Sequence, residues 1–411
     1  MKILILGEGG REHAIGKKLL EDNFDINLYF YPGNGGTKLI GHNIEKKCSI
    51  LDLVNFSKKN NISLTIVGSE IFLMKKVVDL FQFHKLNIIG PNYNSSKLEG
   101  DRIFAKSFMK KYGIRTPKYE TFYSYDKAKN FSKQKTSLVI KSNGIASGKG
   151  VIISHNKNEY QKALKSIMVE KKFGKSGEKI IVEEYLNGKE VSILSILNNN
   201  RIIPFISSKD YKKIGNNNLG LNTGGMGAIS PNPYMKNHIW KDFNENILEP
   251  TIEGLISEKL TFLGFLYFGL MIYNNKIYLL EYNTRLGDPE TQSILPLMKN
   301  NFLNMLKSFF YEDKINISWK NYCSCCIVLS SLGYPEKYNI GYIINNFNKL
   351  EEPFYIAGAM RKKGKWITSS GRVLNIIGID TNIKYARKNA YEKINKIKCN
   401  NLYYRKDIGL Y

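Results

Sequence analysis

The sequence is poor in cysteine and proline and has no long hydrophobic run. Its 411 residues include 5 cysteines and 11 prolines. No apolar stretch approaches the ~20 residues that a membrane-spanning helix needs, so we expect no membrane partner. The first ten residues, MKILILGEGG, hold one lysine and a very short apolar run before a glycine turn. This start predicts a first β-strand rather than a signal peptide, and therefore a globular, cytoplasmic protein.

The few cysteines do not complete a metal or disulfide pattern. Their number is odd, and three of them cluster at Cys323, Cys325 and Cys326. Cys323-x-x-Cys326 has the spacing of a zinc or redox pair, but no second pair and no nearby histidine completes a site. The surrounding YCSCCIVLSS is typical of a buried strand, so we expect reduced cysteines in a core.

Acidic residues are scarce relative to basic ones. The chain carries 61 Lys and Arg against 36 Asp and Glu, a formal charge of +25. On its own, such a balance suggests a nucleic-acid partner. However, the lysines are spread along the chain among many Asn, Ile and Tyr, and no RNP, zinc-finger or helix-turn-helix pattern is present. We expect no specific nucleic-acid partner, only nonspecific binding to polyanions at low salt.

The stretch Lys276–Gln292, KIYLLEYNTRLGDPETQ, carries the strongest chemical pattern. It predicts a strand that opens into a polar turn. Side chains alternate on a strand, so Glu281 and Asn283 share one face, where two oxygen ligands suit a hard cation such as Mg²⁺. Arg285 is expected to continue that face and to offer its donors to a carboxylate or phosphate. The alternative is a strand end that carries solvated charges.

The letters E-Y-N followed by R-L-G-D-P-E-T-Q resemble the signature of the phosphoribosylamine–glycine ligase family, which belongs to the ATP-grasp ligases. The resemblance runs from Met1 to the ending at 405–409. It implies that three residues of the turn contact substrate, namely Arg285, Asp288 and Glu290. It also implies Mg²⁺ or Mn²⁺ at Glu281 and Asn283.

The resemblance further implies an α/β multidomain protein with an ATP-grasp fold. The expected parts are an N-terminal Rossmann-like parallel α/β domain over 1–100, an ATP-grasp domain over 101–320 with a small αβ lid at about 118–190, and a C-terminal β-rich α+β domain over 321–411.

Residues 1–100 alternate short apolar runs with helical stretches, as in a parallel sheet. Strands are expected at Lys2–Leu6, Ile26–Tyr31, Leu64–Val67 and Leu86–Ile89. Ligands of such sheets lie outside the carboxyl ends of the strands, where three loops resemble family loops that hold phosphoribosylamine. The first is glycine-rich and precedes a helix, which favours a phosphate. The expected contacts are Gly9, Gly10, Arg11, Glu12, Gly33, Asn34, Gly35, Gly68 and Glu70.

The ATP site is expected around a glycine hairpin. Strands at Ser137–Lys141 and Val151–Ser154 flank a loop whose backbone N–H groups can close over a triphosphate. Lys141 precedes the loop and can meet the phosphates as a point charge. Asn143 stands where the family has an acid.

The resemblance adds the other ATP contacts. A helix from Leu98 to about Tyr112 carries Lys106, which matches a phosphate-binding lysine, and Glu190 matches the residue that holds the ribose. The strand before it is expected to hold adenine through its backbone. The full ATP set is Lys106, Lys141, Gly144, Ser147, Gly148, Lys149, Gly150, Glu183, Glu184, Tyr185, Leu186 and Glu190.

Two later segments resemble substrate loops of the family. In Ser208–Lys213 only three positions match the pattern S-Q-D-H-K-R, and Asp210 alone carries over as a contact to glycine or ribosylamine. Lys209 and Tyr211 depart from it. The second loop adds Thr223, Gly224, Gly225, Met226 and Gly227, and is preceded by Leu219 and Leu221 where the family has Asp and Pro. A helix at Ile239–Lys259 and a strand at Phe265–Tyr273 are expected next.

The region from about Asn301 shows few chemical groups. Strands are expected at Cys325–Ser330, Phe354–Met360, Trp366–Thr368 and Val373–Asp380, with a helix at Lys384–Lys396. We interpret it as a β-rich domain that braces the active cleft. The chain ends at Tyr411, so we expect no further enzyme fused to it.

The resemblance implies an enzyme that joins glycine to 5-phosphoribosylamine at the expense of ATP, in purine biosynthesis. The resemblance implies an acyl phosphate intermediate, with Arg285, Lys141 and Asp210 as the catalytic residues. Two alternatives stay open: another ATP-grasp ligase for a different acid or amine, and a non-catalytic basic protein that binds nucleotide or nucleic acid. The sequence does not decide between a monomer and a homodimer.

Overall fold

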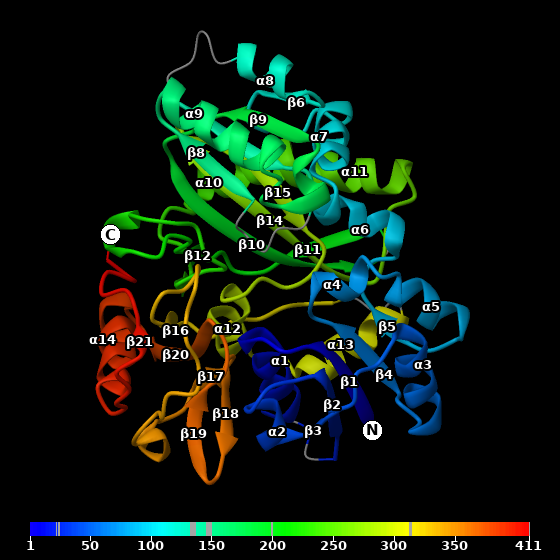
Figure 1. Cartoon of the computed structure of the whole chain (residues 1–411). Helices are drawn as coiled ribbons and strands as arrows, with labels where there is room; N and C mark the ends of the chain where they lie inside the picture. The colour runs from blue at the N-terminus through cyan, green and yellow to red at the C-terminus, as the bar shows by residue number, and fades with distance from the viewer. Residues whose placement is uncertain are drawn as a thin grey trace.

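A computed structural model describes residues 1–21, 23, 25–131, 137–144, 150–198, 200–311 and 315–410. Figure 1 shows three parts around a centre: the N-terminal part in blue, the lid and central sheet above, and the C-terminal part in orange and red. No helix within those ranges is long and apolar enough to cross a membrane. The expected ATP contacts Ser147, Gly148 and Lys149 lie outside the described residues.

The N-terminal part is a parallel sheet in the order β3-β2-β1-β4-β5. Its strands are β1 (Lys2–Gly7), β2 (Asn27–Pro32), β3 (His42–Asn43), β4 (Leu64–Val67) and β5 (Ile88–Ile89). Its helices are α1 (Gly10–Glu21), α2 (Thr37–Ile40), α3 (Ile50–Lys59), α4 (Glu70–Leu73) and α5 (Val77–Phe83). The four expected strands are confirmed. The two-residue β3 was not predicted, since HN carries no apolar pattern.

The connection into the next part corrects one expectation. The single helix predicted from Leu98 is two helices, α6 (Tyr93–Gly100) and α7 (Arg102–Lys111). Asp101 is extended, with φ −133° and ψ 98°, and its side chain accepts a 3.0 Å hydrogen bond from the Phe104 N–H. An aspartate that caps the free N–H groups of a helix start favours such a break.

The lid is an antiparallel sheet in the order β6-β9-β7-β8. Its strands are β6 (Tyr119–Phe122), β9 (Ile180–Glu184), β7 (Leu138–Ser142) and β8 (Val151–Ser154), covered by α8 (Tyr125–Phe131) and α9 (Lys157–Leu164), after which a π-helical turn spans Lys165–Val169. The predicted hairpin is confirmed: β7 and β8 pair with Lys141 opposite Val151. The glycine loop therefore starts directly beside Lys141.

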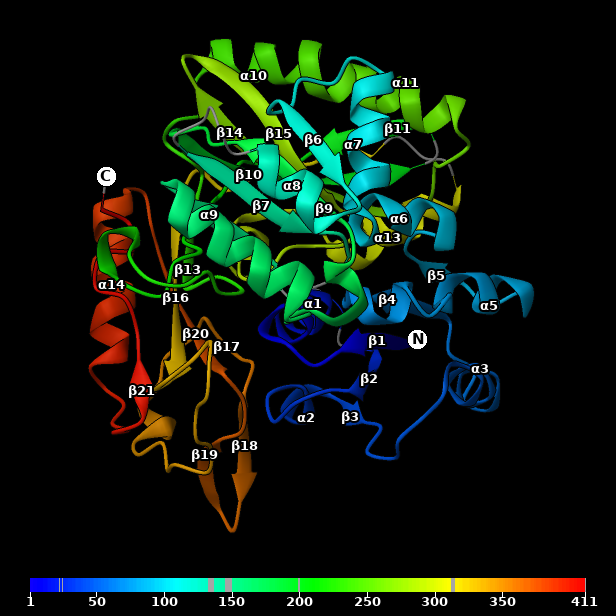
Figure 2. The ribbon, with the colours of Figure 1, turned by 45° about the horizontal axis from the view of Figure 1, so that its top comes forward.

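The central sheet has the order β11-β10-β14-β15 and is antiparallel. Its strands are β11 (Arg201–Pro204), β10 (Lys189–Asn198), β14 (Gly264–Tyr273) and β15 (Lys276–Asn283). Helices α10 (Asn237–Phe243) and α11 (Glu249–Ser257) lie over its outer face in Figure 2. The one helix expected at Ile239–Lys259 is interrupted by a π-helical turn at Asn244–Leu248, just before Pro250, which has no N–H to donate. 

The C-terminal sheet recruits strands from the middle of the chain. Its order is β12-β13-β16-β20-β17, with β21 beside β16. The strands are β12 (Lys209–Asp210), β13 (Gly227–Ser230), β16 (Cys323–Ser331), β20 (Arg372–Asp380), β17 (Phe354–Ile356) and β21 (Leu402–Tyr403). Thus both segments expected to contact substrate, at Asp210 and before Gly227, are anchored in this sheet.

The remaining elements complete the C-terminal part. The strand predicted at Phe354–Met360 is β17 followed by β18 (Ala359–Lys362), which pairs with β19 (Lys365–Thr368). Helix α14 (Ile383–Ile394) packs on β20, and α12 (Glu290–Ile294) and α13 (Phe302–Tyr311) precede β16 in the chain. Cys325 and Cys326 are free thiols buried in β16, as expected, while Cys323 is half-buried.

Candidate active site

All three parts of the chain line one cleft of about 1850 Å³. Most of the expected contacts border it, from the N-terminal loops, the lid, the central sheet and the turn after β15. Of the expected contacts that the structure describes, six do not: Gly10, Gly68, Gly150, Gly225, Met226 and Gly227. Several of these residues lie directly behind residues that line the cleft. A Cβ on Gly68 would come within 2.1 Å of Glu12 Oε1, for example, so this glycine allows Glu12 to reach the ends of β1 and β4.

At the lid end, one buried carboxylate lies between two lysines. Glu183 Oε1 is 3.0 Å from Lys106 Nζ, and its Oε2 is 2.8 Å from Lys141 Nζ. All three side chains are at most 7% exposed. Burial lowers the pKa of Lys106 to about 8, although Glu183 opposes the shift. The expected role of Glu183 involved its backbone, and this side-chain position was not predicted. Two ammonium groups next to one carboxylate leave a net positive charge for an anion.

On β15 the two proposed metal ligands both border the cleft. Gly269 lies opposite Glu281 on β14, so no side chain competes for the space. Burial opposes ionisation of Glu281, but Lys212, 3.6 Å from its Oε1, outweighs this together with other cations and lowers the pKa of Glu281 to about 2. The carboxylate is therefore ionised.

The donor set at this edge fits Mg²⁺ or Mn²⁺. Glu281 and Asn283 supply one carboxylate and one amide oxygen, and hard divalent cations prefer oxygen. Among the described residues no group of three His, Cys, Asp or Glu could hold a metal ion. A cation here would take its remaining ligands from phosphate and water.

The first glycine loop is held in place by Glu12, which is fully buried. Glu12 Oε2 accepts a 2.7 Å hydrogen bond from the Gly9 N–H, and its Oε1 pairs with Arg11 Nε at 2.7 Å. Arg11 also donates from Nη1 to the Leu286 carbonyl at 3.0 Å. Asn34 donates to the Glu8, Gly9 and Ile356 carbonyls, at 2.8, 3.1 and 3.0 Å. The first two loops are thus joined to each other and to the turn after β15.

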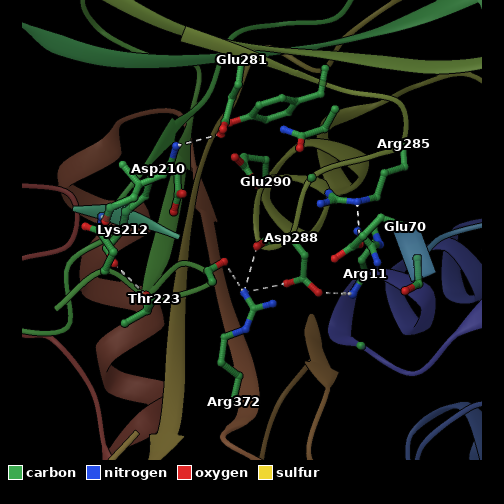
Figure 3. A pocket seen from close by; sticks show the side chains of 18 of the residues that line it. Arg11, Glu70, Asp210, Lys212, Thr223, Glu281, Arg285, Asp288, Glu290 and Arg372 are labelled. Carbon is green, nitrogen blue, oxygen red and sulfur yellow. Dashed lines mark hydrogen bonds and ion pairs between the residues drawn. The ribbon is translucent and has the colours of Figure 1, made fainter. Parts of the chain in front are cut away.

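Two carboxylates face each other in the middle of the cleft (Figure 3). Asp210 is 7% exposed and its Oδ1 has no hydrogen-bond partner among the described residues. Burial, reinforced by Glu290, raises the pKa of Asp210 well above its usual range. Glu290 Oε1 accepts a 3.1 Å hydrogen bond from Ser192 Oγ. An unpartnered buried carboxylate is costly unless a cation meets it, so this pair suits an amine.

Comparison with known proteins matches the whole chain to one family. The family models described as Phosphoribosylglycinamide synthetase N domain, ATP-grasp (A) domain and C domain match residues 1–99, 100–291 and 324–411. A phosphoribosylamine–glycine ligase of Fusobacterium nucleatum is 45% identical over 419 residues, covering 100% of this chain and 98% of that protein. One of Clostridium acetobutylicum is 43% identical, covering 100% and 99%. The chain belongs to the phosphoribosylamine–glycine ligase family.

Solved structures agree with this membership. The crystal structure of the phosphoribosylamine–glycine ligase of Thermotoga maritima is 31% identical, with a TM-score of 0.86, and the match covers 99% of this chain and 100% of that one. A biotin carboxylase of Campylobacter jejuni has a TM-score of 0.75 at 14% identity, over 100% and 94%, which shows the fold alone. The ATP-grasp fold predicted from the sequence is therefore confirmed, and so is the family.

In this phosphoribosylamine–glycine ligase family member, Arg285 borders the cleft as predicted, but not by continuing the face of the strand. Strand β15 ends at Asn283, so Arg285 follows it in a turn and no longer continues the alternation. Its Nε is 2.9 Å from Glu70 Oε2, its Nη2 is 2.8 Å from Glu99 Oε1, and its Nη1 donates to the Leu286 carbonyl at 3.1 Å. Arg285 is the main cause that lowers the pKa of Glu70 to about 2. All three nitrogens of this guanidinium thus have partners.

Two contacts explain positions where the sequence departs from the family pattern. Asn143 Oδ1 accepts a 3.0 Å hydrogen bond from the Ile103 N–H at the start of α7, which an acid in this position could also accept. Lys209 Nζ lies 4.8 Å from the ring centre of Tyr211. The lysine and the tyrosine therefore form a cation–π contact with each other.

Sequence reasoning missed several residues that border or brace the cleft: Glu99, Tyr334 and Arg372. Glu99 also accepts a 2.8 Å hydrogen bond from the Thr284 N–H, directly after the proposed metal ligands. Tyr334 Oη accepts a 3.0 Å hydrogen bond from the Gly224 N–H. None of the three belongs to a local motif with chemical meaning, and only the fold brings them to the site.

Proposed function

We propose that the protein joins glycine to 5-phosphoribosylamine, converting ATP to ADP and phosphate and giving glycinamide ribonucleotide in purine biosynthesis. The observation that carries this proposal is the position of the R-L-G-D-P-E turn. Its Asp288 and Glu290 border the same cleft as Lys106, Lys141 and the loops of the N-terminal sheet. Family membership over the full chain supports the same reaction.

The reaction requires activation because a carboxylate is a poor electrophile at neutral pH. The carboxylate of glycine attacks the γ-phosphate of ATP, which gives glycyl phosphate and ADP. The amine of phosphoribosylamine then attacks the acyl carbon and releases phosphate. The protein supplies position and charge rather than a covalent nucleophile.

The nucleotide would lie between the lid and the central sheet. Lys106 and Lys141 supply positive charge to the phosphates, and the strand end at Glu184–Leu186 supplies backbone groups for adenine, with Glu190 beyond it for the ribose. Glu281 and Asn283 would hold Mg²⁺ or Mn²⁺, which neutralises the phosphate charge when bound.

The amine substrate would lie on the N-terminal side. The loop Gly9–Glu12 and the loop Gly33–Gly35 border the cleft at the carboxyl ends of the parallel strands, where a phosphate is favoured. Asp210 and Glu290 would receive the ammonium group of the other substrate, glycine. The family models that match residues 1–99, 100–291 and 324–411 support the domain division 1–100, 101–320 and 321–411. A cytoplasmic location would suit an enzyme of purine biosynthesis.

For Arg285 we propose a positioning role instead of the anion contact expected from the sequence. Its guanidinium joins Glu70 of the N-terminal part to Glu99 and to the turn of Leu286. These contacts argue against a free fork of donors. Arg285 would instead hold the phosphoribosylamine loops against the metal strand.

Phosphate release tests the proposal. The purified protein is supplied with ATP, Mg²⁺, phosphoribosylamine and one of glycine, alanine or serine. We expect turnover with glycine, little with the larger amino acids, and none when either substrate is left out. Equal turnover with alanine would indicate a ligase for a different acid, and no turnover with any acid would favour a binding protein.

A further inference from the structure

Arg372, at the start of β20 in the C-terminal part, has donors that no protein group uses. Its Nη1 donates to the carbonyls of Gly224 and Asp288, at 2.7 and 2.9 Å, and lies 3.2 Å from Asp288 Oδ1. Within the described part of the chain, all hydrogen bonds and ion pairs of this guanidinium come from Nη1. The side chain is 21% exposed and borders the cleft. Nε–H and Nη2–H are therefore available to an anion.

Arg285 and Arg372 differ in how many of their guanidinium nitrogens contact protein oxygen. Every nitrogen of Arg285 is paired with protein oxygen, whereas Arg372 is fixed by one nitrogen and keeps two. A guanidinium with two free neighbouring donors can bind a carboxylate with two parallel hydrogen bonds, which is the strongest geometry available to it.

Asp210 approaches the same loop as this guanidinium, and its Oδ1 has no hydrogen-bond partner among the described residues. A Cβ on Gly224 would be 3.1 Å from Arg372 Cζ, and a Cβ on the next residue, Gly225, would be 2.9 Å from Asp210 Oδ1. Successive Cα atoms are ~3.8 Å apart, so Arg372 and Asp210 approach neighbouring residues of one loop. Both side chains border the cleft. Figure 3 shows Arg372 below Asp288, with Asp210 above it on the other side of the Thr223 loop.

The loop lies close to the turn that carries Pro289. Gly225 has φ +113°, which an L-residue with a side chain rarely adopts, and a Cβ there would also come within 2.4 Å of Pro289 Cδ. A free cation donor on one side and a buried carboxylate on the other match the two charges of a small zwitterion.

We propose that Arg372 is a substrate-binding residue whose Nε–H and Nη2–H hold the carboxylate of the α-amino acid, while Asp210 receives its ammonium group. This inference rests on the proposed function and adds to it a contact from the C-terminal part, which the sequence had suggested to be only a brace. Arg372 then keeps the carboxylate oriented as it attacks ATP.

The test compares Arg372→Lys with Tyr334→Phe. Lysine can replace the Nη1 contacts to Gly224 and Asp288 but cannot offer the fork. Tyr334→Phe removes another hydrogen bond to the Gly224 loop without removing a cation, so it reports what loosening the loop does. For each variant the KM values for glycine, phosphoribosylamine and ATP are measured, together with inhibition by glycinamide, which lacks the carboxylate.

We expect Arg372→Lys to raise the glycine KM by about ten- to a hundredfold, as for the loss of a charged hydrogen bond. The other two KM values and the glycinamide inhibition constant should stay within about twofold. Tyr334→Phe should show no such selectivity. If thermal unfolding shows that Arg372→Lys does not fold, Arg372→Gln, which keeps one amide donor for the Gly224 carbonyl, replaces it with the same expectation.

Three results would overturn the inference. An unchanged glycine KM would show that the guanidinium does not touch the carboxylate. A selective rise in the phosphoribosylamine KM would make it a phosphate ligand. Equal changes in all constants, repeated by Tyr334→Phe, would leave it a loop anchor only. In all three cases the wild-type protein still uses glycine, so only the role of Arg372 is refuted. If the wild-type protein does not use glycine, the proposed function itself is wrong.

Discussion

Loss of the positive charge of Lys106 should lower the affinity for ATP in mildly alkaline solution. The buried environment lowers its pKa to about 8, against an ordinary value of about 10.5, even with Glu183 only 3.0 Å away. With that pKa, roughly 3% of the lysine stays protonated at pH 9.5, when the free protein has lost nearly all of this charge. Each pH unit above 8 should therefore weaken ATP binding by about tenfold, until the ~1.5–3 kcal/mol of a charged hydrogen bond is lost.

Calorimetric titration with ATP and Mg²⁺ between pH 7 and 9.5 measures this effect without interference from the amine substrate. Lys106→Arg keeps its charge throughout the range, so its affinity should not depend on pH in this way, even if it is lower. Glu183→Gln should move the fall in affinity below pH 8, because Glu183 raises the pKa of Lys106. Lys110→Met, on the exposed side of the same helix, is the matched control.

The reasoning fails if Lys106→Arg loses affinity above pH 8 just as the wild type does. The alkaline loss would then belong to another group. It also fails if the wild-type affinity is constant to pH 9.5, since Lys106 would then either stay protonated or not contribute to binding.

Two further substitutions test the strand end and the turn after it. Glu281→Gln should abolish most turnover and raise the Mg²⁺ concentration needed for what remains, because it removes the only carboxylate on the proposed metal. The control Glu245→Gln, on exposed surface, should do neither. Equal Mg²⁺ dependence in both variants would refute the placement of the metal. Arg285→Met should lower the free energy of unfolding at pH 7 by about 3–5 kcal/mol, since it leaves two carboxylates unpaired. The lowered pKa of Glu70 stabilises the folded wild type above pH 4.5, and this stabilisation is lost as the pH falls toward 2. The difference in unfolding free energy between wild type and variant, measured with denaturant, should therefore shrink on acidification. A difference that stays constant would contradict the ion-pair explanation.

Local patterns were sufficient wherever one element determined the answer. The alternation on β15 correctly brought Glu281 and Asn283 to the cleft, because side-chain direction on a strand depends only on the strand. The hairpin around Lys141 followed from apolar runs that flank glycines. The same reasoning stopped working at the ends of elements. Asp101 interrupts a helix that apolar spacing alone would continue, because its side chain satisfies the N–H groups of a new helix start.

The two arginines show why the rest could not be predicted. Arg285 stands in a motif, but what a guanidinium can bind depends on what already surrounds it. Glu70 and Glu99 come from elements about two hundred residues earlier, and they occupy two of the donors that the motif offers. Arg372 stands in no motif. Its strand β20 pairs with β16, which pairs in turn with β13 at the end of the substrate loop, and this arrangement brings the arginine to the cleft. Motif residues indicate which chemistry a family performs, whereas the free donors in the folded site decide which side chain performs each step.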